Sequence, residues 1–230
     1  MLHWLLVSLM LFTAPAVASD KTLLKAAKKG RIEEVNALLA SGASADAADR
    51  KGYTALMAAA ANGHGAIALA LINAGATLDL KDRSRRSALD WAKRKEQAAI
   101  VELLQFYSAR DAQQIDLLER FITEYPAGSY TSQAKESLHE AHFLHSIREA
   151  TVESYRNFIE QFPHSGHVPT VREALRGAWW RKLTSTKHPS SAELSAFIGM
   201  FPQAGRIDNV QSYLARARER EARMTTEGEP

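Results

Sequence analysis

Apolar and polar positions in the first half of the chain repeat with a period of 33 residues. Residues 22–52 can be aligned with residues 55–85, and a third, looser copy begins at Ser87. The matched pairs include Gly30 with Gly63, Gly42 with Gly75, Asp46 with Asp79, Asp49 with Asp82, Leu23 with Leu56, Ala26 with Ala59 and Leu38 with Leu71. A fixed period of this size indicates a solenoid, in which each unit buries one face against its neighbour.

Each repeat predicts two short helices, which are clearest in the middle copy. Thr54 is a typical N-cap residue, and the alanine-rich stretch 55–61 after it fits a helix that packs closely. Gly63 ends this helix, because glycine readily takes the left-handed conformation that follows a helix. A second helix is expected over residues 66–74, with Gly75 as its stop.

A different repeat occupies residues 111–223. An amphipathic helix with apolar residues at i, i+3, i+4 and i+7 occurs three times and ends each time before a proline. The prolines are Pro126, Pro163 and Pro202. A polar turn follows each proline, and the pattern then predicts second helices over residues 132–148, 168–182 and 207–223.

The 33-residue unit resembles the ankyrin repeat over about residues 20–109. The family pattern is represented here by Gly52, Thr54, Leu56, Ala59, Ala60, Asn62-Gly63-His64, Leu71-Ile72 and Gly75-Ala76. Ala55 and Met57 replace the proline and histidine of that pattern, and Arg85 and Glu96 replace two glycines in the third copy, which reads as a capping repeat. The resemblance implies a solenoid that recognises other macromolecules.

The later repeats resemble the tetratricopeptide-like units of bacterial envelope proteins, and the copy from Leu118 to Ala134 matches best. The predicted fold is therefore all-α, an ankyrin-repeat solenoid (residues 19–109, the third repeat a cap) followed by a helical-hairpin array (residues 110–223). We expect the join near residues 108–112; one continuous array and two independent domains both fit the sequence. Residues 224–230 are expected to be a disordered tail.

Residues 1–18 have the features of a secretory signal peptide. Trp4–Phe12 is almost wholly apolar, and Ala16-Val17-Ala18 has the small-x-small form recognised by signal peptidase, so we expect cleavage before Ser19. An uncleaved anchor and a short buried helix are the alternatives. The chain has no cysteine, so disulfides and thiolate chemistry are excluded. The prediction is a periplasmic or secreted protein without a membrane span after cleavage.

Positive charge is concentrated on the ankyrin-like half, where residues 19–109 carry 14 Lys and Arg against 10 Asp and Glu. The ankyrin resemblance implies that residues around the turns and at the ends of the first helices face the partner. In this chain the positions selected for that role are Lys28, Lys29, Arg50, Lys51, Tyr53, Arg83, Arg86, Trp91, Arg94 and Lys95. A merely solvated charged face is the alternative. We expect an acidic protein surface as partner, with an anionic envelope polymer or lipid headgroup second and no nucleic acid.

The sequence offers little support for catalysis or cofactor binding. A dinucleotide-like glycine motif at Gly63 is explained by the repeat, and no nucleophile elbow is present. His139, His142 and His145 follow one another at i+3 on a predicted helix, but they do not form the zincin motif. We therefore predict no catalytic, metal-ligating or cofactor-binding residue.

The functional prediction is a monomeric, non-enzymatic, exported adaptor that binds a protein partner. An immunity or inhibitor protein that occludes an envelope toxin or enzyme is the second hypothesis. A metal-dependent hydrolase that uses the three histidines is the third and belongs to another class.

Overall fold

The computed structural model describes residues 16–203 and 207–226. These residues form twelve α-helices and no strand, which confirms the all-α prediction. Most of the expected signal peptide, residues 1–15, lies outside the described part of the chain. The first helix begins at Ala16, so the expected cleavage position after Ala18 lies in its first turn.

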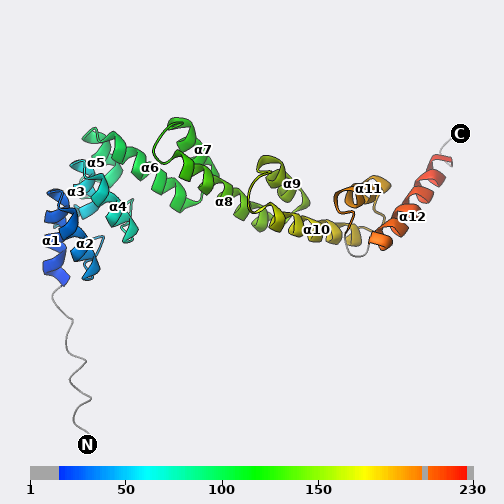
Figure 1. The fold of residues 1–230 in the computed structure, drawn as a ribbon, viewed down its shortest axis with the longest axis horizontal. Helices are drawn as coiled ribbons and strands as arrows, with labels where there is room; N and C mark the ends of the chain where they lie inside the picture. Colours follow the sequence, from blue (N-terminus) through cyan, green and yellow to red (C-terminus); the bar gives the residue numbers. More distant parts are fainter. Residues whose placement is uncertain (1–15, 204–206, 227–230) are drawn as a thin grey trace, which may run out of the picture. The chain divides into compact units, whose positions relative to one another are not determined.

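The first six helices are stacked as pairs, as expected for a 33-residue repeat (Figure 1). They are α1 (Ala16–Lys28), α2 (Ile32–Ala40), α3 (Ala55–Ala61), α4 (Gly65–Asn73), α5 (Ala88–Arg94) and α6 (Ala98–Ala112). Within each pair the two helices contact each other, and α3 also packs against α1 and α5. The second helices form a parallel layer, in which α4 contacts α2 and α6.

Small residues at equivalent positions of the three repeats allow these helices to approach closely. Ala26, Ala59 and Ala92 are buried on the three first helices, where a larger side chain would hold the helices apart. Leu56 and Leu71 are also fully buried and supply apolar area to the same core. The apolar positions that define the sequence repeat are therefore the positions that pack one repeat against the next.

The turns between helices use left-handed backbone, at the predicted helix stops Gly63 and Gly75 and also at further positions. Gly52 and Gly63 have φ of +72° and +76°, and the equivalent residues of the third repeat, Arg85 and Glu96, have φ of +59° and +55°. Residues with a Cβ rarely adopt this conformation. The third repeat therefore keeps the turn geometry after losing its glycines, so the backbone there is strained in a way that the first two repeats avoid.

The first helix of the hairpin region, α7 (Ile115–Glu124), packs against the last ankyrin-phase helix, α6. Phe106 of α6 lies 5.8 Å from Phe121 of α7 and stacks on Tyr130 at 5.2 Å between ring centroids. The Tyr125 hydroxyl donates a 2.6 Å hydrogen bond to Gln105 Oε1 of α6. This aromatic contact makes α7 part of the first structural unit.

The remaining five helices contribute to a second core. They are α8 (Thr131–Glu149), α9 (Val152–Gln161), α10 (Val168–Ser185), α11 (Ser191–Met200) and α12 (Ile207–Thr226). The pairs α9 with α10 and α11 with α12 pack together, as the predicted hairpins require. Phe158, Leu175, Trp179 and Phe197 are buried in this core. No helix within residues 16–203 and 207–226 has the length and apolar character needed to cross a membrane.

By its internal contacts the chain divides into two units, one ending at Leu138 and the other starting at His139. This boundary falls inside α8, whereas the repeats placed the join near residues 108–112, which are the end of α6. The reason is the aromatic packing of α7 on α6. Helix α12 continues to Thr226, so residues 224–226 of the expected tail are helical, and residues 227–230 lie outside the described residues.

Candidate functional site

Two consecutive turns lead into α3 and α5, and each is closed by an aspartate at its first position. Asp49 Oδ1 accepts hydrogen bonds from the backbone N–H groups of Lys51 (2.7 Å) and Tyr53 (3.0 Å). An aspartate followed by polar residues forms such a turn because its short side chain reaches the backbone two to four residues on. The turn holds the side chains of Lys51 and Tyr53 at the surface.

The second turn repeats this arrangement 33 residues later. Asp82 Oδ1 accepts from the N–H groups of Ser84 (2.8 Å) and Arg86 (3.0 Å). The two turns are joined by a 2.9 Å hydrogen bond from the Arg83 N–H to the Lys51 carbonyl. The backbone therefore fixes the spacing of the two turns and of the charged side chains that they carry.

Trp91 lies at the centre of the site and is contacted from three sides. Its indole Nε1–H donates a 3.0 Å hydrogen bond to Asp82 Oδ2, and its ring makes an edge contact with Tyr53 at 5.3 Å between centroids. The guanidinium carbon of Arg86 lies 4.9 Å from the centroid of the indole, a cation–π distance. Trp91 and Tyr53 are both half-buried, so the cluster leaves aromatic surface exposed.

The electrostatics of the cluster favour an ionised Asp82. Burial of the carboxylate opposes its ionisation. This effect is outweighed by hydrogen bonds from the Arg86 N–H, the Trp91 indole and the Ser84 N–H, together with the positive charge of Arg86. The pKa of Asp82 is therefore below its ordinary value. The pKa of Tyr53 is raised, first by burial of the phenol and then by the negative charges of Asp49 and Asp82. At neutral pH the site therefore contains the ionised carboxylate of Asp82 together with exposed cations.

The helices that carry the site begin with reciprocal caps despite the unusual residues in their turns. Thr54 Oγ1 accepts the Met57 N–H at 3.2 Å, and the Met57 sulfur accepts the Thr54 N–H at 3.5 Å. At the start of α5, Ser87 Oγ accepts the Asp90 N–H at 3.2 Å, and Asp90 Oδ2 accepts the Ser87 N–H at 2.8 Å. A thioether and a carboxylate thus serve the same capping function in adjacent repeats.

Of the residues selected from the sequence, the structure brings Tyr53, Arg86 and Trp91 into direct contact, with the backbones of Lys51 and Arg83 joined beside them. The other selected residues are exposed cations: Lys28, Lys29, Arg50, Arg94 and Lys95. Lys28 and Arg94 end α1 and α5, and the contacts that form the cluster do not include them.

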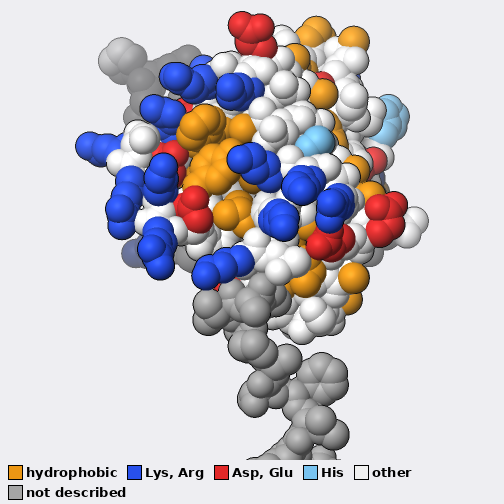
Figure 2. Space-filling view, turned by 90° about the vertical axis from the view of Figure 1, so that its left-hand side faces the viewer, with side chains coloured by type: hydrophobic (Ala, Val, Ile, Leu, Met, Phe, Trp, Pro, Cys, Tyr) orange, Lys and Arg blue, Asp and Glu red, His pale blue; other side chains and the backbone are white. Residues whose placement is uncertain are grey.

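Figure 2 views the molecule from the side of α1–α5 and shows the chemical character of this face. Lys and Arg side chains surround an exposed patch of hydrophobic side chains, and a few Asp and Glu side chains lie among them. An apolar centre within a charged rim is the usual composition of a surface that binds another protein. We call the turn residues 49–53 and 82–86, together with Trp91, the turn face.

The sequence reasoning did not select Asp82, although this residue organises the site. In the sequence Asp82 is a landmark of the repeat, aligned with Asp49, and the acidic residue of the dinucleotide-like motif that the repeat explains; the predicted partner-binding positions were mainly cations. The signal that could have identified it is the replacement of Ala58 by Trp91 in the next repeat. That replacement places an indole donor near the turn, and a buried donor of this kind needs an acceptor.

The histidines of α8 do not form a metal site within the described residues, where no group of three or more His, Asp or Glu side chains has a suitable arrangement. His139 and His142 instead pack against Phe162, with ring centroids 4.6 and 4.9 Å apart. His167 stacks on the Phe143 ring at 4.1 Å and its Nε2 lies 2.8 Å from Glu140 Oε2.

Fold and site together define a helical repeat protein with a charged, aromatic surface at its turns. The comparison with known families makes this specific, because residues 23–116 match the family model for ankyrin repeats in three copies. This part of the chain is an ankyrin-repeat domain, as the sequence pattern predicted. No curated protein matches the chain. The later hairpins have no family match, so their resemblance to tetratricopeptide-like repeats stays a prediction.

Ankyrin repeats indicate protein–protein interaction, and proteins built from them are generally non-enzymatic binding scaffolds. The repeats place the Asp49 and Asp82 turns in adjacent units, joined through the Arg83 and Lys51 backbones. A partner that contacts the turn face therefore touches two repeats at once. The ankyrin repeats indicate interaction with another protein, but they do not identify the surface through which this chain binds it.

Proposed function

We propose that the chain is an adaptor that binds an acidic surface of a partner protein through the turn face. The observation that carries this proposal is the Tyr53–Trp91–Arg86 cluster, in which exposed aromatic surface lies beside cations. Tyr, Trp and Arg are the residue types that most often dominate the energy of protein interfaces. The exposed Arg50, Lys51 and Arg83 in the same turns supply a rim of positive charge.

Binding would occur in two stages. Long-range attraction between the cationic rim and an acidic partner surface accelerates the encounter, an effect that salt weakens. The aromatic patch of Tyr53 and Trp91 is then buried, which lowers the dissociation rate. Asp82 contributes indirectly, because it fixes the indole of Trp91 and the backbone of Arg86 before the partner arrives.

Reversal of the rim charge tests this function. The double variant Arg50→Glu with Arg83→Glu is expected to associate with the captured partner at least about tenfold more slowly at low salt, with a weaker salt dependence. Affinity purification from an envelope extract would identify the partner, and stopped-flow or biosensor kinetics would give the rates. Both substituted residues are exposed, so the helical circular dichroism should not change.

The matched control reverses Arg120, an exposed cation on α7 that lies outside the turn face. Arg120→Glu alters the net charge in the same direction and should leave the association rate within about twofold, because this cation is not part of the rim that is proposed to face the partner. If the double variant recovers the same partners at the same rates as the unaltered chain, the turn face is not the binding site.

The proposed partner belongs to the cell envelope, because we propose that the chain is exported as a monomer after removal of residues 1–18. The support is the sequence pattern of an apolar stretch followed by Ala16 and Ala18. The mature protein purified from its native source is expected to begin at Ser19, as measured by intact mass and N-terminal peptide mapping. Recovery of a soluble protein that retains Met1 would contradict export.

A further inference from the structure

A second candidate site lies in the other structural unit, where the C-terminal part of α10, the loop to α11 and the face of α12 enclose a pocket of about 400 Å³. Ligand-binding pockets in proteins are typically about 300–1,000 Å³, so the cavity can hold one or two side chains or a small molecule. The pocket shares no residue with the turn face. Neither the family match nor the proposed adaptor function accounts for it.

The interior of this pocket is apolar and partly aromatic. It is lined by Leu183 and Leu194, which are both buried, and by Trp180, which is half-buried. Tyr213 of α12 also lines the pocket and is 51% exposed, which is unusual for a large aromatic residue beside an apolar cavity. An occupant would remove this exposed ring from water.

The charged residues that line the pocket are all basic. Lys187 and His188 come from the loop, and Arg216 and Arg220 come from α12, whereas no Asp or Glu lines the cavity. Within the described residues, neither Lys187 nor Arg216 forms an ion pair or a hydrogen bond. Arg220 is partly engaged, because its Nη2 donates to the Pro189 carbonyl at 2.9 Å. The lining is therefore complementary to an anionic group.

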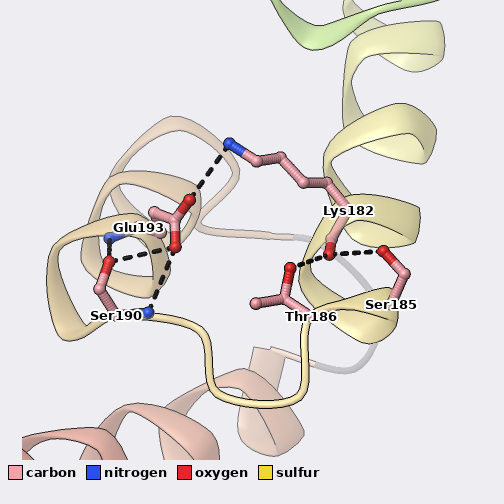
Figure 3. Close-up of polar contacts among 5 residues, drawn as sticks. All are labelled: Lys182, Ser185, Thr186, Ser190 and Glu193. Atoms are coloured by element: carbon pink, nitrogen blue, oxygen red, sulfur yellow. Dashed lines mark hydrogen bonds and ion pairs between the residues drawn. The ribbon is translucent and has the colours of Figure 1, made fainter.

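Two nearby carboxylates hold the loop in place, and one of them, Glu221, also interacts electrostatically with Arg220 of the pocket lining. Glu193 accepts from the N–H and hydroxyl of Ser190 and lies 3.1 Å from the ammonium group of Lys182, an arrangement shown in Figure 3. Glu221 accepts from the N–H and hydroxyl of Ser191 at 2.9 and 2.6 Å. The Lys182 hydrogen bond to Glu193 and the Ser191 hydrogen bonds to Glu221 contribute to lowered pKa values of both carboxyls.

The same contacts pre-organise the loop that forms one side of the pocket. The Thr186 hydroxyl donates to the Lys182 carbonyl at 2.8 Å at the start of the loop, and Ser190 caps α11 at its end (Figure 3). A loop fixed at both ends loses little further entropy when a ligand binds. The site is thus an apolar pocket with a basic rim on a braced backbone.

We propose that this pocket binds a segment of a partner protein in which an aromatic or aliphatic side chain neighbours a carboxylate. The apolar side chain enters beside Trp180 and Tyr213, and the carboxylate pairs with Arg216. A protein segment fits better than a free small molecule, because small ligands are usually enclosed over most of their surface, whereas half of Tyr213 faces water. A polypeptide supplies further contacts outside the cavity.

Isothermal titration calorimetry with the full chain and three end-blocked synthetic peptides tests this proposal. The sequences are Asp-Phe-Glu-Leu, its neutral analogue Asn-Phe-Gln-Leu, and its polar analogue Asp-Ser-Glu-Ser. We expect the first peptide to bind at least about tenfold more tightly than either analogue, since only this peptide satisfies both the apolar base and the basic rim. Equal binding of the polar analogue would indicate non-specific attraction and overturn the proposal, as would failure of the first peptide to bind.

Two variants of α12 give the matched comparison. Arg216→Glu is expected to weaken binding of the first peptide at least about tenfold. Arg218→Glu makes the same charge change two residues on, which is about 200° around the helix and outside the pocket lining, and should alter binding less than about twofold. Equal effects of the two variants would refute the proposed binding site. Tight binding of free phenylacetate would show that the pocket takes small molecules and would refute the binding of a protein segment.

Discussion

Replacement of Asp82 with alanine is expected to lower the stability of the third repeat by about 2–3 kcal/mol and to release the indole of Trp91. Asp82 is only 9% exposed as a residue, and its carboxylate accepts from two backbone N–H groups and the Trp91 indole. Removing a buried acceptor leaves those donors without a partner. Hydrogen exchange measured by mass spectrometry should show faster exchange in residues 82–94, because local stability in a repeat protein is not captured by one global transition.

Asp49→Ala is the matched control, since Asp49 occupies the same position one repeat earlier. Its carboxylate is exposed and accepts from two backbone N–H groups without an indole, so the expected cost is about 1 kcal/mol or less. Similar costs for both variants would show that the Trp91 contact adds nothing to stability.

The pH dependence gives an independent readout of the same carboxylate. The folded-state pKa of Asp82 lies below the unfolded value of about 3.9, so its ionisation stabilises the fold above that value, and the contribution is lost as the pH falls through the folded pKa. The stability difference between the unaltered chain and Asp82→Asn should therefore shrink below about pH 4. A constant difference across that range would exclude this carboxylate as the cause.

The backbone of the ankyrin half could be predicted closely because each repeat constrains the others. Positive φ at Gly52 is expected of a glycine in a turn. Positive φ at Arg85 could be inferred because Arg85 occupies the position of Gly52 in the next repeat, although its side chain disfavours that conformation. By contrast, Gln113 and Ala150 also adopt positive φ, at +48° and +51°, and nothing in the sequence indicated it. They lie at junctions between helices, where no repeated glycine marks the turn.

The side-chain cluster at the site could be predicted only in part. The repeat phase placed Tyr53 and Trp91 on the surface that is expected to face a partner, but the hydrogen bond to Asp82 depends on the orientation of an indole that no other ankyrin repeat contains. The packing of α7 on α6 was also missed. That contact joins Phe106 of the last ankyrin-phase helix to Phe121 and Tyr130 of the first hairpin copy, and neither repeat pattern by itself predicts a contact between the two regions.

Replacement of Phe197 with alanine is expected to have the largest effect in the second unit, about 3–5 kcal/mol. Its ring is 2% exposed and contacts Trp179, Trp180 and Phe201, with centroid distances of 5.8, 6.3 and 5.3 Å. Removing it leaves a cavity between α10 and α11 that the surrounding indole rings cannot fill without leaving their rotamers.

The loss should stay within the second unit. Because helices of a repeat array are stabilised by their neighbours, Phe197→Ala is expected to speed amide exchange in α10–α12 and to leave α3 to α5 unchanged. Met200→Ala, on the same helix but 43% exposed, should cost less than about 1 kcal/mol. Equal loss of protection in α3 and α11 would show that the chain unfolds as one cooperative body. Such a result would mean that the contact boundary inside α8 does not separate two units of stability.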